Sequence, residues 1–280
     1  MSDKKTIWIT GSKGFLGSEF MTRFADLGYN VVGTDKEVTV CDPDRLVLFA
    51  QEAQPDVVIN CAGIPRSVTG LGNRIRAYET NALGARNVAL AANSVGALVI
   101  QVSTDDVFPP RLHEPVNEFD NPHPECAYGK SKRAGETMVR DTTPEHAIVR
   151  SSWLYSVNGG ILMDILDAVN AGKVYKARTD QFASPTSVSM YVRFLDRLIQ
   201  NGGTGVFHIT SQGCVSRYDF AAKVMEICGF DKGKFLEPAT DLVTAEKVEL
   251  ESLMLEMYGA QLPSWDDDLR AYLEEVGLAK

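Results

Sequence analysis

The stretch TIWITGSKGFLG (residues 6–17) decides the fold of this chain, because it joins a buried strand to a helix through a glycine-rich loop. Residues 6–10 form a short apolar, β-rich run that a glycine stops, and a helical pattern follows the loop. Gly11, Gly14 and Gly17 allow a tight turn, a close backbone approach to a pyrophosphate, and close packing of helix on strand. The spacing G-x-x-G-x-x-G differs from the commoner G-x-G-x-x-G, so a glycine-rich turn without a ligand stays the alternative.

The next strand ends on a carboxylate that suits a dinucleotide. Residues 30–34 form a second β-branched run that leads to Asp35. A carboxylate at this position accepts hydrogen bonds from the adenosine ribose hydroxyls and repels a 2′-phosphate. It therefore favours NAD(H) over NADP(H), although the neighbouring Lys36 could accommodate a phosphate.

Strands and helices alternate through the first half of the chain. The pattern predicts a helix, a strand, a helix and a strand in turn at residues 43–53, 55–63, 75–94 and 97–102. Such alternation is typical of a parallel sheet with helices on both faces, which is a Rossmann-type, doubly wound α/β fold. Small residues at the end of the third strand leave room for a cofactor across the sheet edge.

The chain as a whole is predicted to divide into two α/β parts. Residues 1–150 should form a dinucleotide-binding Rossmann domain, rejoined by an apolar helix at about 188–200. Residues 151–280 should form mainly a smaller α/β substrate-binding lobe. The other elements expected there are a helix at 161–171, a strand at 205–210, a helix capped by Ser216, a helix-like acidic segment at 242–258 and a last helix capped by Ser264.

Composition and charge exclude several kinds of partner. The chain has 280 residues, 44% of them hydrophobic, and its formal net charge of −9 argues against nucleic acid or an anionic membrane. The five cysteines and four histidines are dispersed, so they indicate neither a metal cluster nor a disulfide framework. The N-terminus lacks the pattern of a signal peptide, and no apolar run approaches the ~20 residues of a membrane span. We therefore expect a cytoplasmic protein without a metal site.

A phenol and an ammonium group stand at the head of a helix predicted to run to about Arg140. Tyr128 and Lys132 share one helix face at the spacing i, i+4, so both should point into the same space. A cation beside a phenol favours the phenolate and moves its pKa from about 10 toward neutrality. Taken alone the pattern is weak, because an amphipathic helix with a solvated lysine produces it too.

Hydroxyls and carboxylates follow the fourth strand. Residues 103–106 (STDD) should lie just past that strand, at the sheet edge where ligands bind in open α/β folds. The same residue types also cap turns. A proline-rich connection, residues 109–124, then leads to Tyr128 as an ordered excursion or a mobile lid.

Together these motifs resemble an extended short-chain dehydrogenase/reductase and, within that class, the dTDP-4-dehydrorhamnose reductase family. The likeness covers residues 6 to about 229, and several independent matches in the right order make coincidence improbable. The stretches that carry it are PDVVINCAG (55–63), STDDVF (103–108), YGKSKRAGE (128–136), IVRSSWLYS (148–156) and DQFASPTS (180–187).

The resemblance implies that nicotinamide delivers hydride to a sugar ketone while a tyrosine donates a proton. Carried over, Tyr128 is the general acid, Lys132 lowers its pKa and bonds the nicotinamide ribose, and Thr104 polarises the carbonyl. The other implied roles are cofactor binding by Gly11, Gly14, Phe15, Leu16, Asp35, Gly63, Ile64, Tyr128 and Lys132, and substrate binding by Thr104, Asp105, Asp106 and Trp153. A large core anchor is an equal expectation for Trp153. The implied partners are a nucleotide-sugar substrate and, at most, a second copy of the chain in a homodimer.

Three departures from the family pattern leave the sugar open. Asp106 stands where members usually have tyrosine, and Thr39 where they usually have an aspartate near the adenine, although Asp42 is close by. Residues 65–70 (PRSVTG) replace the usual Val-Asp-Lys-Ala stretch. The first and third changes fall where the sugar should sit, so a hexulose other than 4-dehydrorhamnose is a plausible substrate.

Two alternative functions also stay open. The triplet Thr104-Asp105-Asp106 is similar to the Thr-Asp-Glu triplet of nucleotide-sugar 4,6-dehydratases, which would make the protein a dehydratase or an epimerase. The shorter aspartate and the stretch DQFASPTS fit the reductases better. The resembled family also includes a non-catalytic regulatory subunit, a partner of methionine adenosyltransferase that keeps the reductase fold.

Overall fold

The computed structural model describes residues 4–69, 71–110, 114–240 and 245–280. The chain forms two compact units that alternate along the sequence. The first unit contains residues 1–108, 121–150 and 192–207, and the second contains residues 109–120, 151–191 and 208–280.

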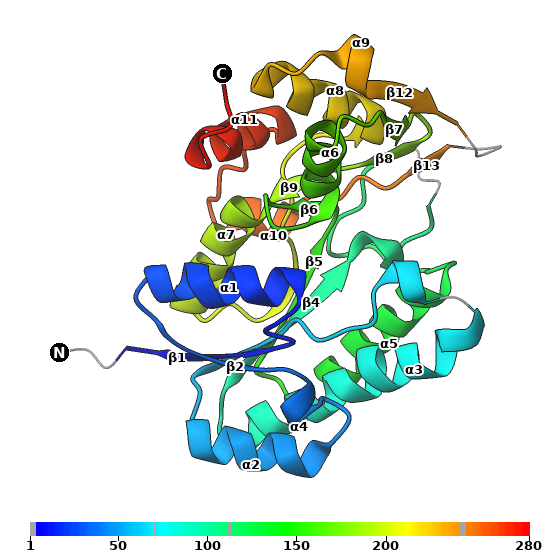
Figure 1. Ribbon diagram of the computed structural model, residues 1–280. Helices are drawn as coiled ribbons and strands as arrows, with labels where there is room; N and C mark the ends of the chain where they lie inside the picture. Colours follow the sequence, from blue (N-terminus) through cyan, green and yellow to red (C-terminus); the bar gives the residue numbers. More distant parts are fainter. Residues whose placement is uncertain (1–3, 70, 111–113, 241–244) are drawn as a thin grey trace. The chain divides into compact units, whose positions relative to one another are not determined.

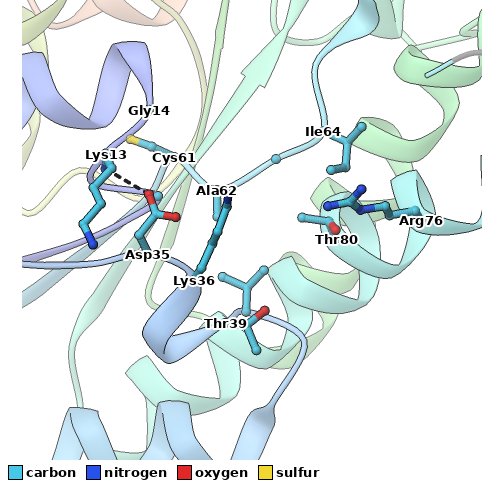
Figure 2. Close-up of a pocket in the computed structure, with 13 residues that line it drawn as sticks. Lys13, Gly14, Asp35, Lys36, Thr39, Cys61, Ala62, Ile64, Arg76 and Thr80 are labelled. Atoms are coloured by element: carbon cyan, nitrogen blue, oxygen red, sulfur yellow. Dashed lines mark hydrogen bonds between the residues drawn. The ribbon is translucent and has the colours of Figure 1, made fainter. Parts of the chain in front are cut away.

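The first unit is built on a six-stranded sheet with the order β10-β5-β4-β3-β1-β2. Its strands are β1 (Thr6–Thr10), β2 (Asn30–Thr34), β3 (Val57–Asn60), β4 (Leu98–Thr104), β5 (His146–Ser151) and β10 (Gly205–His208). Strand β1 pairs in parallel with both β2 and β3, and β3 pairs in parallel with β4. The strand order therefore reverses beside β1, and this is the place where open α/β sheets bind ligands. Figure 2 shows the pocket at this edge, lined by residues that follow β1 and β3.

Helices cover both faces of this sheet, as Figure 1 shows. They are α1 (Phe15–Asp26), α2 (Pro43–Ala53), α3 (Arg74–Tyr78), α4 (Ala85–Ser94), α5 (Ala127–Thr142) and α7 (Val188–Asn201). On the side of α2, α4 and α5, the alanine-rich face of α4 approaches Trp8 and Val99 closely in one buried cluster. On the side of α1, the Tyr29 hydroxyl donates to Asp196 Oδ1 of α7 at 2.6 Å. The predicted doubly wound Rossmann fold is confirmed.

Two local expectations for the first unit are wrong in detail. The helix predicted at 75–94 is not regular, because a π-helical segment, Glu79–Gly84, separates α3 from α4. Such segments redirect side chains within a helix, and this one aims Asn81 at the candidate site. Ser103 and Thr104 do not follow the fourth strand but end it, since β4 extends to Thr104.

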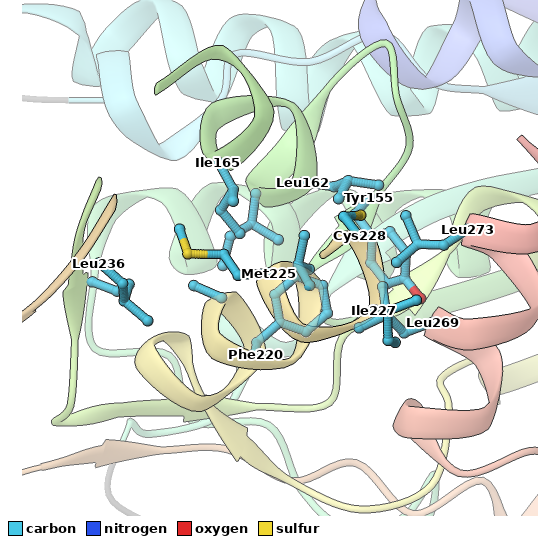
Figure 3. Packing of buried hydrophobic residues seen from close by; sticks show 14 of the residues in the cluster. Tyr155, Leu162, Ile165, Phe220, Met225, Ile227, Cys228, Leu236, Leu269 and Leu273 are labelled. Atoms are coloured by element: carbon cyan, nitrogen blue, oxygen red, sulfur yellow. The ribbon is translucent and has the colours of Figure 1, made fainter. Parts of the chain in front are cut away.

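The second unit consists of short strands and helices around its own core. Its strands form the sheets β11-β8-β13, β12-β7 and β6-β9. The strands are β6 (Leu154–Tyr155), β7 (Tyr175–Arg178), β8 (Gln181–Ala183), β9 (Thr186–Ser187), β11 (Val215–Ser216), β12 (Leu236–Ala239) and β13 (Glu246–Lys247). The helices are α6 (Gly160–Asn170), α8 (Arg217–Cys228), α9 (Lys232–Phe235), α10 (Leu253–Met257) and α11 (Trp265–Glu275). Figure 3 shows Leu162 of α6, Phe220 of α8 and Leu269 of α11 packed around Tyr155.

Several predictions for this unit can be compared with the structure. The hydroxyls of Ser216 and Ser264 cap α8 and α11 by accepting from backbone N–H groups, as the capping-box spacing predicts. The helix-like pattern at 242–258 is wrong for most of the residues described there, which form β13 and then only the short α10. Residues 242–244 of that segment lie outside the described residues, as do residues 111–113 of the proline-rich connection. In the described part of that connection, the Glu118 carboxylate accepts from His208 N at 2.9 Å, so this part is an ordered excursion.

A buried carboxylate ties α11 to the strands of the second unit. Asp268 Oδ2 accepts hydrogen bonds from the Tyr155 hydroxyl at 3.1 Å, from Ser187 N at 2.7 Å and from Ser211 Oγ at 3.0 Å. Its Oδ1 accepts from Ser187 Oγ at 2.7 Å. Burial and the Asp268 charge raise the pKa of the Tyr155 phenol, which therefore stays a donor.

We expect Asp268→Asn to lower the free energy of unfolding by about 2–4 kcal/mol, because the amide replaces an acceptor oxygen with a donor that faces other donors. Denaturant unfolding followed by circular dichroism measures the change. Asp167→Asn on the exposed face of α6 is the matched control and should leave stability within about 0.5 kcal/mol. Equal stability of the two variants would contradict the structural role of Asp268.

Candidate active site

The glycine-rich loop between β1 and α1 is held by two contacts between backbone segments. Gly11 has φ +67°, and a Cβ there would lie 2.8 Å from Ala62 Cα. A Cβ on Gly17 would overlap the Gly11 carbonyl oxygen. Gly14 differs, because a Cβ there would meet only Gly11 O at 3.3 Å, and its open side faces a pocket. Gly11 and Gly17 therefore shape the loop, and Gly14 leaves room for a ligand.

The pocket beside the loop has a volume of about 490 Å³. Its lining residues are Gly11, Lys13, Gly14, Asp35, Lys36, Thr39, Val40, Cys61, Ala62, Gly63, Ile64, Arg76 and Thr80. Figure 2 shows Asp35 and Lys36 on one side and Arg76 with Thr80 on the other. The Asp35 carboxylate accepts from Lys13 N at 3.1 Å, which fixes it at the end of β2. The predicted residues Gly11, Gly14, Asp35, Gly63 and Ile64 are thus brought together.

The start of helix α1 makes this pocket suitable for the pyrophosphate of a dinucleotide. Helix α1 begins at the pocket. Its N-cap residue is Gly14, which has no side chain that could bond the first amide groups of the helix. Amide groups at such a helix start favour an anionic pyrophosphate. Phe15 and Leu16, predicted to lie against the pyrophosphate, are the first residues of α1 but are not among the lining residues. Of the two residues considered for the adenine end, Thr39 lines the pocket, whereas Asp42 caps α2 through Arg45 N.

A buried asparagine fixes the part of the pocket that follows β3. Asn81 Oδ1 accepts from Ile64 N at 2.7 Å, and Asn81 Nδ2 donates to Ile64 O at 3.1 Å. The same Nδ2 donates to Ser131 Oγ at 2.9 Å, and that hydroxyl donates to Tyr128 O. One side chain from the π-helical segment therefore joins the pocket wall to helix α5.

A row of buried polar groups crosses the ends of the central strands. Thr10 Oγ1 donates to Asn60 Oδ1 at 2.6 Å, and Asn60 Nδ2 donates to Gln101 Oε1 at 2.7 Å. Gln101 Nε2 donates to Val102 O, which also accepts from Lys132 Nζ at 2.5 Å. Each member has a partner, so the row links the strand ends to Lys132 without a buried unsatisfied group among them.

Tyr128, in the first turn of α5, lies close to Thr104, the last residue of β4. A hydrogen bond from the Thr104 side chain lowers the pKa of the Tyr128 phenol, but burial and the nearby carboxylates Asp106 and Asp105 raise it more. The phenol therefore stays protonated at neutral pH. Gly129 makes this arrangement possible, because a Cβ there would overlap the Asp106 carbonyl oxygen. A larger residue would push the first turn of α5 away from the end of β4.

Lys132 does not act on Tyr128 in the expected way. Burial lowers the pKa of the Lys132 ammonium to about 8, and the charge of Glu136 opposes this shift. Lys132 Nζ donates to Val102 O, and Lys132 is not among the groups that lower the pKa of Tyr128. The pKa of the phenol is raised rather than moved toward neutrality as predicted, because burial and the nearby groups Asp106, Asp105 and Cys126 all act in the raising direction. The ammonium is still mostly charged at pH 7.

A buried ion pair supports the same helix one turn further on. Glu136 accepts from Arg150 Nε at 3.0 Å and Nη2 at 2.9 Å, and from Ser103 Oγ at 2.6 Å. These bonds hold the pKa of the Glu136 carboxyl below its ordinary value in spite of burial. The pair connects α5 to β4 and β5, so it fixes the height of Lys132 above the sheet.

The predicted substrate residues fall into two groups. Asp105 and Asp106 follow Thr104 in the first unit, and the Asp106 carboxylate pairs with Arg66 Nη1 at 2.7 Å. Trp153 belongs to the second unit, where the Arg217 guanidinium lies 4.1 Å from the centre of its ring. Trp153 also packs against the core of that unit, as expected of an anchor.

Sequence reasoning missed Asn81, Gln101 and Arg76. Two of them left a signal, because a lone polar residue on an apolar strand or on an alanine-rich helix face requires a buried partner. Gln101 interrupts LVIQV (98–102), and Asn81 is a buried polar residue within the helix predicted at 75–94. Across the described residues, no cluster of histidine, cysteine or acidic side chains could hold a metal ion. A helix long and apolar enough to cross a membrane is likewise absent from the described ranges.

A Rossmann sheet with a glycine-rich loop and a Tyr-x-x-x-Lys pair on α5 defines the class of short-chain dehydrogenases/reductases. Within it the chain belongs to the RmlD substrate binding domain family, whose sequence model matches residues 5–278. The resemblance stated from the sequence is confirmed.

Individual relatives are similar over most of the chain. The spore coat polysaccharide biosynthesis protein SpsK of Bacillus subtilis is 31% identical over 96% of this chain and 97% of its own length. A dTDP-4-dehydrorhamnose reductase of Mycobacterium tuberculosis is 35% identical over 80% of this chain and 75% of its own. The crystal structure of dTDP-4-dehydrorhamnose reductase from Bacillus anthracis in complex with NADP has a TM-score of 0.90 and 30% identity, and covers 98% of this chain and 99% of its own.

Proposed function

We propose that the protein is an NAD(P)H-dependent oxidoreductase that reduces the 4-keto group of a nucleotide-linked 6-deoxy sugar. The observation that carries this proposal is the position of Tyr128, the second residue of α5, where that helix packs against the turn after β4 and carries Lys132 one turn further on. The dinucleotide pocket and this pair are joined by Asn81. The sugar class comes from the relatives, which include dTDP-4-dehydrorhamnose reductases.

In this reaction, nicotinamide when bound supplies a hydride to the carbonyl carbon of the substrate. Tyr128 gives its phenolic proton to the carbonyl oxygen, so that a ketone, one hydride and one proton become an alcohol. The raised pKa of Tyr128 keeps that proton available at neutral pH. The family resemblance implies that Thr104 is the second donor toward the oxygen, where negative charge develops, although in this structure its hydroxyl donates to Asp105 Oδ1 at 3.0 Å.

The residues around this pair have supporting roles. As the family resemblance implies, Lys132 bonds the nicotinamide ribose. Glu136 and the backbone carbonyl of Val102 hold its ammonium in place. The roles of Asp105, Asp106 and Trp153 toward the sugar nucleotide stay predictions.

The cofactor preference follows from the charges that line the pocket. Asp35 favours ribose hydroxyls over a 2′-phosphate, whereas Lys36 and Arg76 could stabilise the phosphate. We propose that NADH is preferred and that NADPH is also accepted. Asp35→Ser should raise the kcat/KM ratio of NADPH to NADH at least about tenfold, since about 1.4 kcal/mol of repulsion is removed.

Initial rates with the two cofactors at a fixed sugar concentration measure this ratio. Lys36→Gln is the opposite control and should lower the ratio, because it removes a cation from the same wall. If Asp35→Ser lowers kcat/KM equally for both cofactors, Asp35 serves only to hold the loop through Lys13 N. The preference between NADH and NADPH would then have another origin.

The proposed function is tested by supplying NADH with a nucleotide 4-keto-6-deoxyhexose and following oxidation of the cofactor. Oxidation should depend on the sugar. Turnover of a nucleotide hexose without net cofactor consumption would instead support the dehydratase or epimerase hypothesis, and Asp106→Asn should then abolish it. The ion pair between Asp106 and Arg66 favours the reductase, because a carboxylate held by a cation is a weaker base.

The regulatory hypothesis predicts a third outcome. A protein that turns over neither substrate but co-purifies with another enzyme would be a non-catalytic subunit. The intact set of Thr104, Tyr128 and Lys132 favours catalysis, since a regulatory subunit would not need a protonated phenol beside a buried ammonium.

A further inference from the structure

An ion pair joins two turns that are far apart in the sequence and next to the catalytic phenol. Arg66 lies in the turn Arg66–Val68 that follows β3, and Asp106 lies in the turn Asp105–Val107 that follows β4. Arg66 Nη1 is 2.7 Å from Asp106 Oδ1, with the arginine side chain 53% exposed and the aspartate 19% exposed. The pair is thus reachable by solvent on one side and packed against the site on the other.

Asp106 is also fixed against the first turn of α5. Its backbone N–H donates to Thr104 Oγ1 at 3.2 Å, and its carbonyl oxygen packs onto Gly129 so closely that a Cβ there would overlap it. The Cys126 thiol, at the N-cap of α5, lies 3.9 Å from Asp106 Oδ1. A negative charge on Asp106 therefore acts directly on the start of the helix that carries Tyr128.

We propose that Arg66 is a positioning residue for proton transfer, which holds the Asp106 carboxylate and balances its charge beside Tyr128. The inference rests on the proposed function, and it adds a residue that does not need to touch the substrate. An unbalanced carboxylate next to a phenol disfavours the phenolate, and therefore makes the phenol a poorer proton donor. A guanidinium at hydrogen-bond distance reduces that penalty.

The groups around Tyr128 determine the pKa of its phenol. Asp106 and Asp105 raise the pKa of the phenol by their charge, Cys126 acts in the same direction, and Thr104 lowers the pKa by a hydrogen bond. The same field reaches Cys126, where Asp106 raises the pKa of the thiol and Arg66 lowers it. The thiol thus reports the Arg66–Asp106 charge balance independently of turnover.

The first test is a double-mutant cycle on turnover. Arg66→Gln should lower kcat about tenfold with little change in KM, because proton donation is impaired while binding is not. In the Asp106→Asn background, the same Arg66→Gln change should have almost no further effect, since the charge to be balanced is gone. Arg140→Gln is the matched control, an arginine beside Asp141 at the far end of α5 that should leave kcat unchanged.

The second test needs no substrate. The alkylation rate of Cys126 by iodoacetamide at fixed pH, mapped by mass spectrometry, should fall several-fold in Arg66→Gln and rise in Asp106→Asn. Both side chains are partly exposed and Asn has the shape of Asp, so both variants should keep the melting temperature of the parent.

Two results would overturn the inference. One is an Arg66→Gln effect of equal size with and without Asp106, or one confined to KM, because Arg66 would then act on the substrate itself. The other is a thiol reactivity that neither variant changes. If no nucleotide keto sugar is reduced at all, the proposed function fails by itself, while the thiol test still decides whether the pair sets the charge beside Tyr128.

Discussion

Replacing Tyr128 with phenylalanine is expected to reduce sugar-dependent NADH oxidation by about 10²–10⁴-fold, the usual contribution of a positioned general acid. The change removes one hydroxyl and keeps the ring, so the first turn of α5 should retain its contact with the end of β4. Binding of the cofactor should persist, because the pocket is lined by other residues. Steady-state kinetics, cofactor titration and thermal unfolding together measure these three quantities.

The control for this variant is an exposed tyrosine that has no proposed role in the reaction. Tyr258 is 61% exposed, and Tyr258→Phe should leave kcat and stability unchanged. A Tyr128→Phe protein that kept full activity would falsify the assignment of the general acid. Loss of activity accompanied by an equal loss of folding would also count against it, since the phenol would then be structural.

The second large effect is expected at Gly17, where alanine should lower the free energy of unfolding by about 3 kcal/mol and abolish cofactor binding. A Cβ there overlaps the Gly11 carbonyl oxygen, and Gly11 cannot retreat because it already lies against Ala62. The overlap is between backbone atoms, so no side-chain rotation relieves it. Denaturant unfolding and NADH fluorescence titration measure the two parts of the effect.

Gly14→Ala is the variant to compare with Gly17→Ala. A Cβ at Gly14 meets only Gly11 O at 3.3 Å, so the fold should survive while the methyl group enters the space that a pyrophosphate would use. We expect near-parental stability and a weaker Kd for NADH. Gly72→Ala, where a Cβ meets nothing within 4 Å, should change neither property. If Gly14→Ala binds NADH as tightly as the parent, the cofactor does not approach this loop.

Much of the first unit could be predicted from the sequence because its signals are local. Residues 6–17 specify a strand, a turn and a helix within one short stretch, and the structure has β1, the loop and α1 there. The capping hydroxyls of Ser216 and Ser264 are local as well, since a cap involves residues three apart. The signal was weaker at 242–258, where an acidic, helix-like pattern led to the wrong prediction of a helix. Pairing with β8 decided the conformation of β13 instead.

The arrangement of the site could be predicted only in part. Tyr128 and Lys132 share a helix face by spacing alone, and their place at the end of β4 follows from the alternation of strands and helices. Their protonation could not be predicted, because it depends on burial, on Asp105 and Asp106 beside Tyr128, and on Glu136 beside Lys132. Nor could the sequence show that Asn81, in the middle of a helix, would turn toward Ile64, since the π-helical segment that aims it has no reliable local pattern.

By itself the sequence determined the class of fold, the dinucleotide loop and the pair Tyr128/Lys132, because each of these depends on residues close together in the chain. Only the tertiary structure decided which charges meet. Arg66 and Asp106 appeared in the sequence as two separate departures from a family pattern, and they turn out to contact each other at 2.7 Å. The reason is that adjacent parallel strands bring the turns after β3 and β4 to one edge of the sheet, and electrostatic interactions depend on distance in space rather than on distance along the chain.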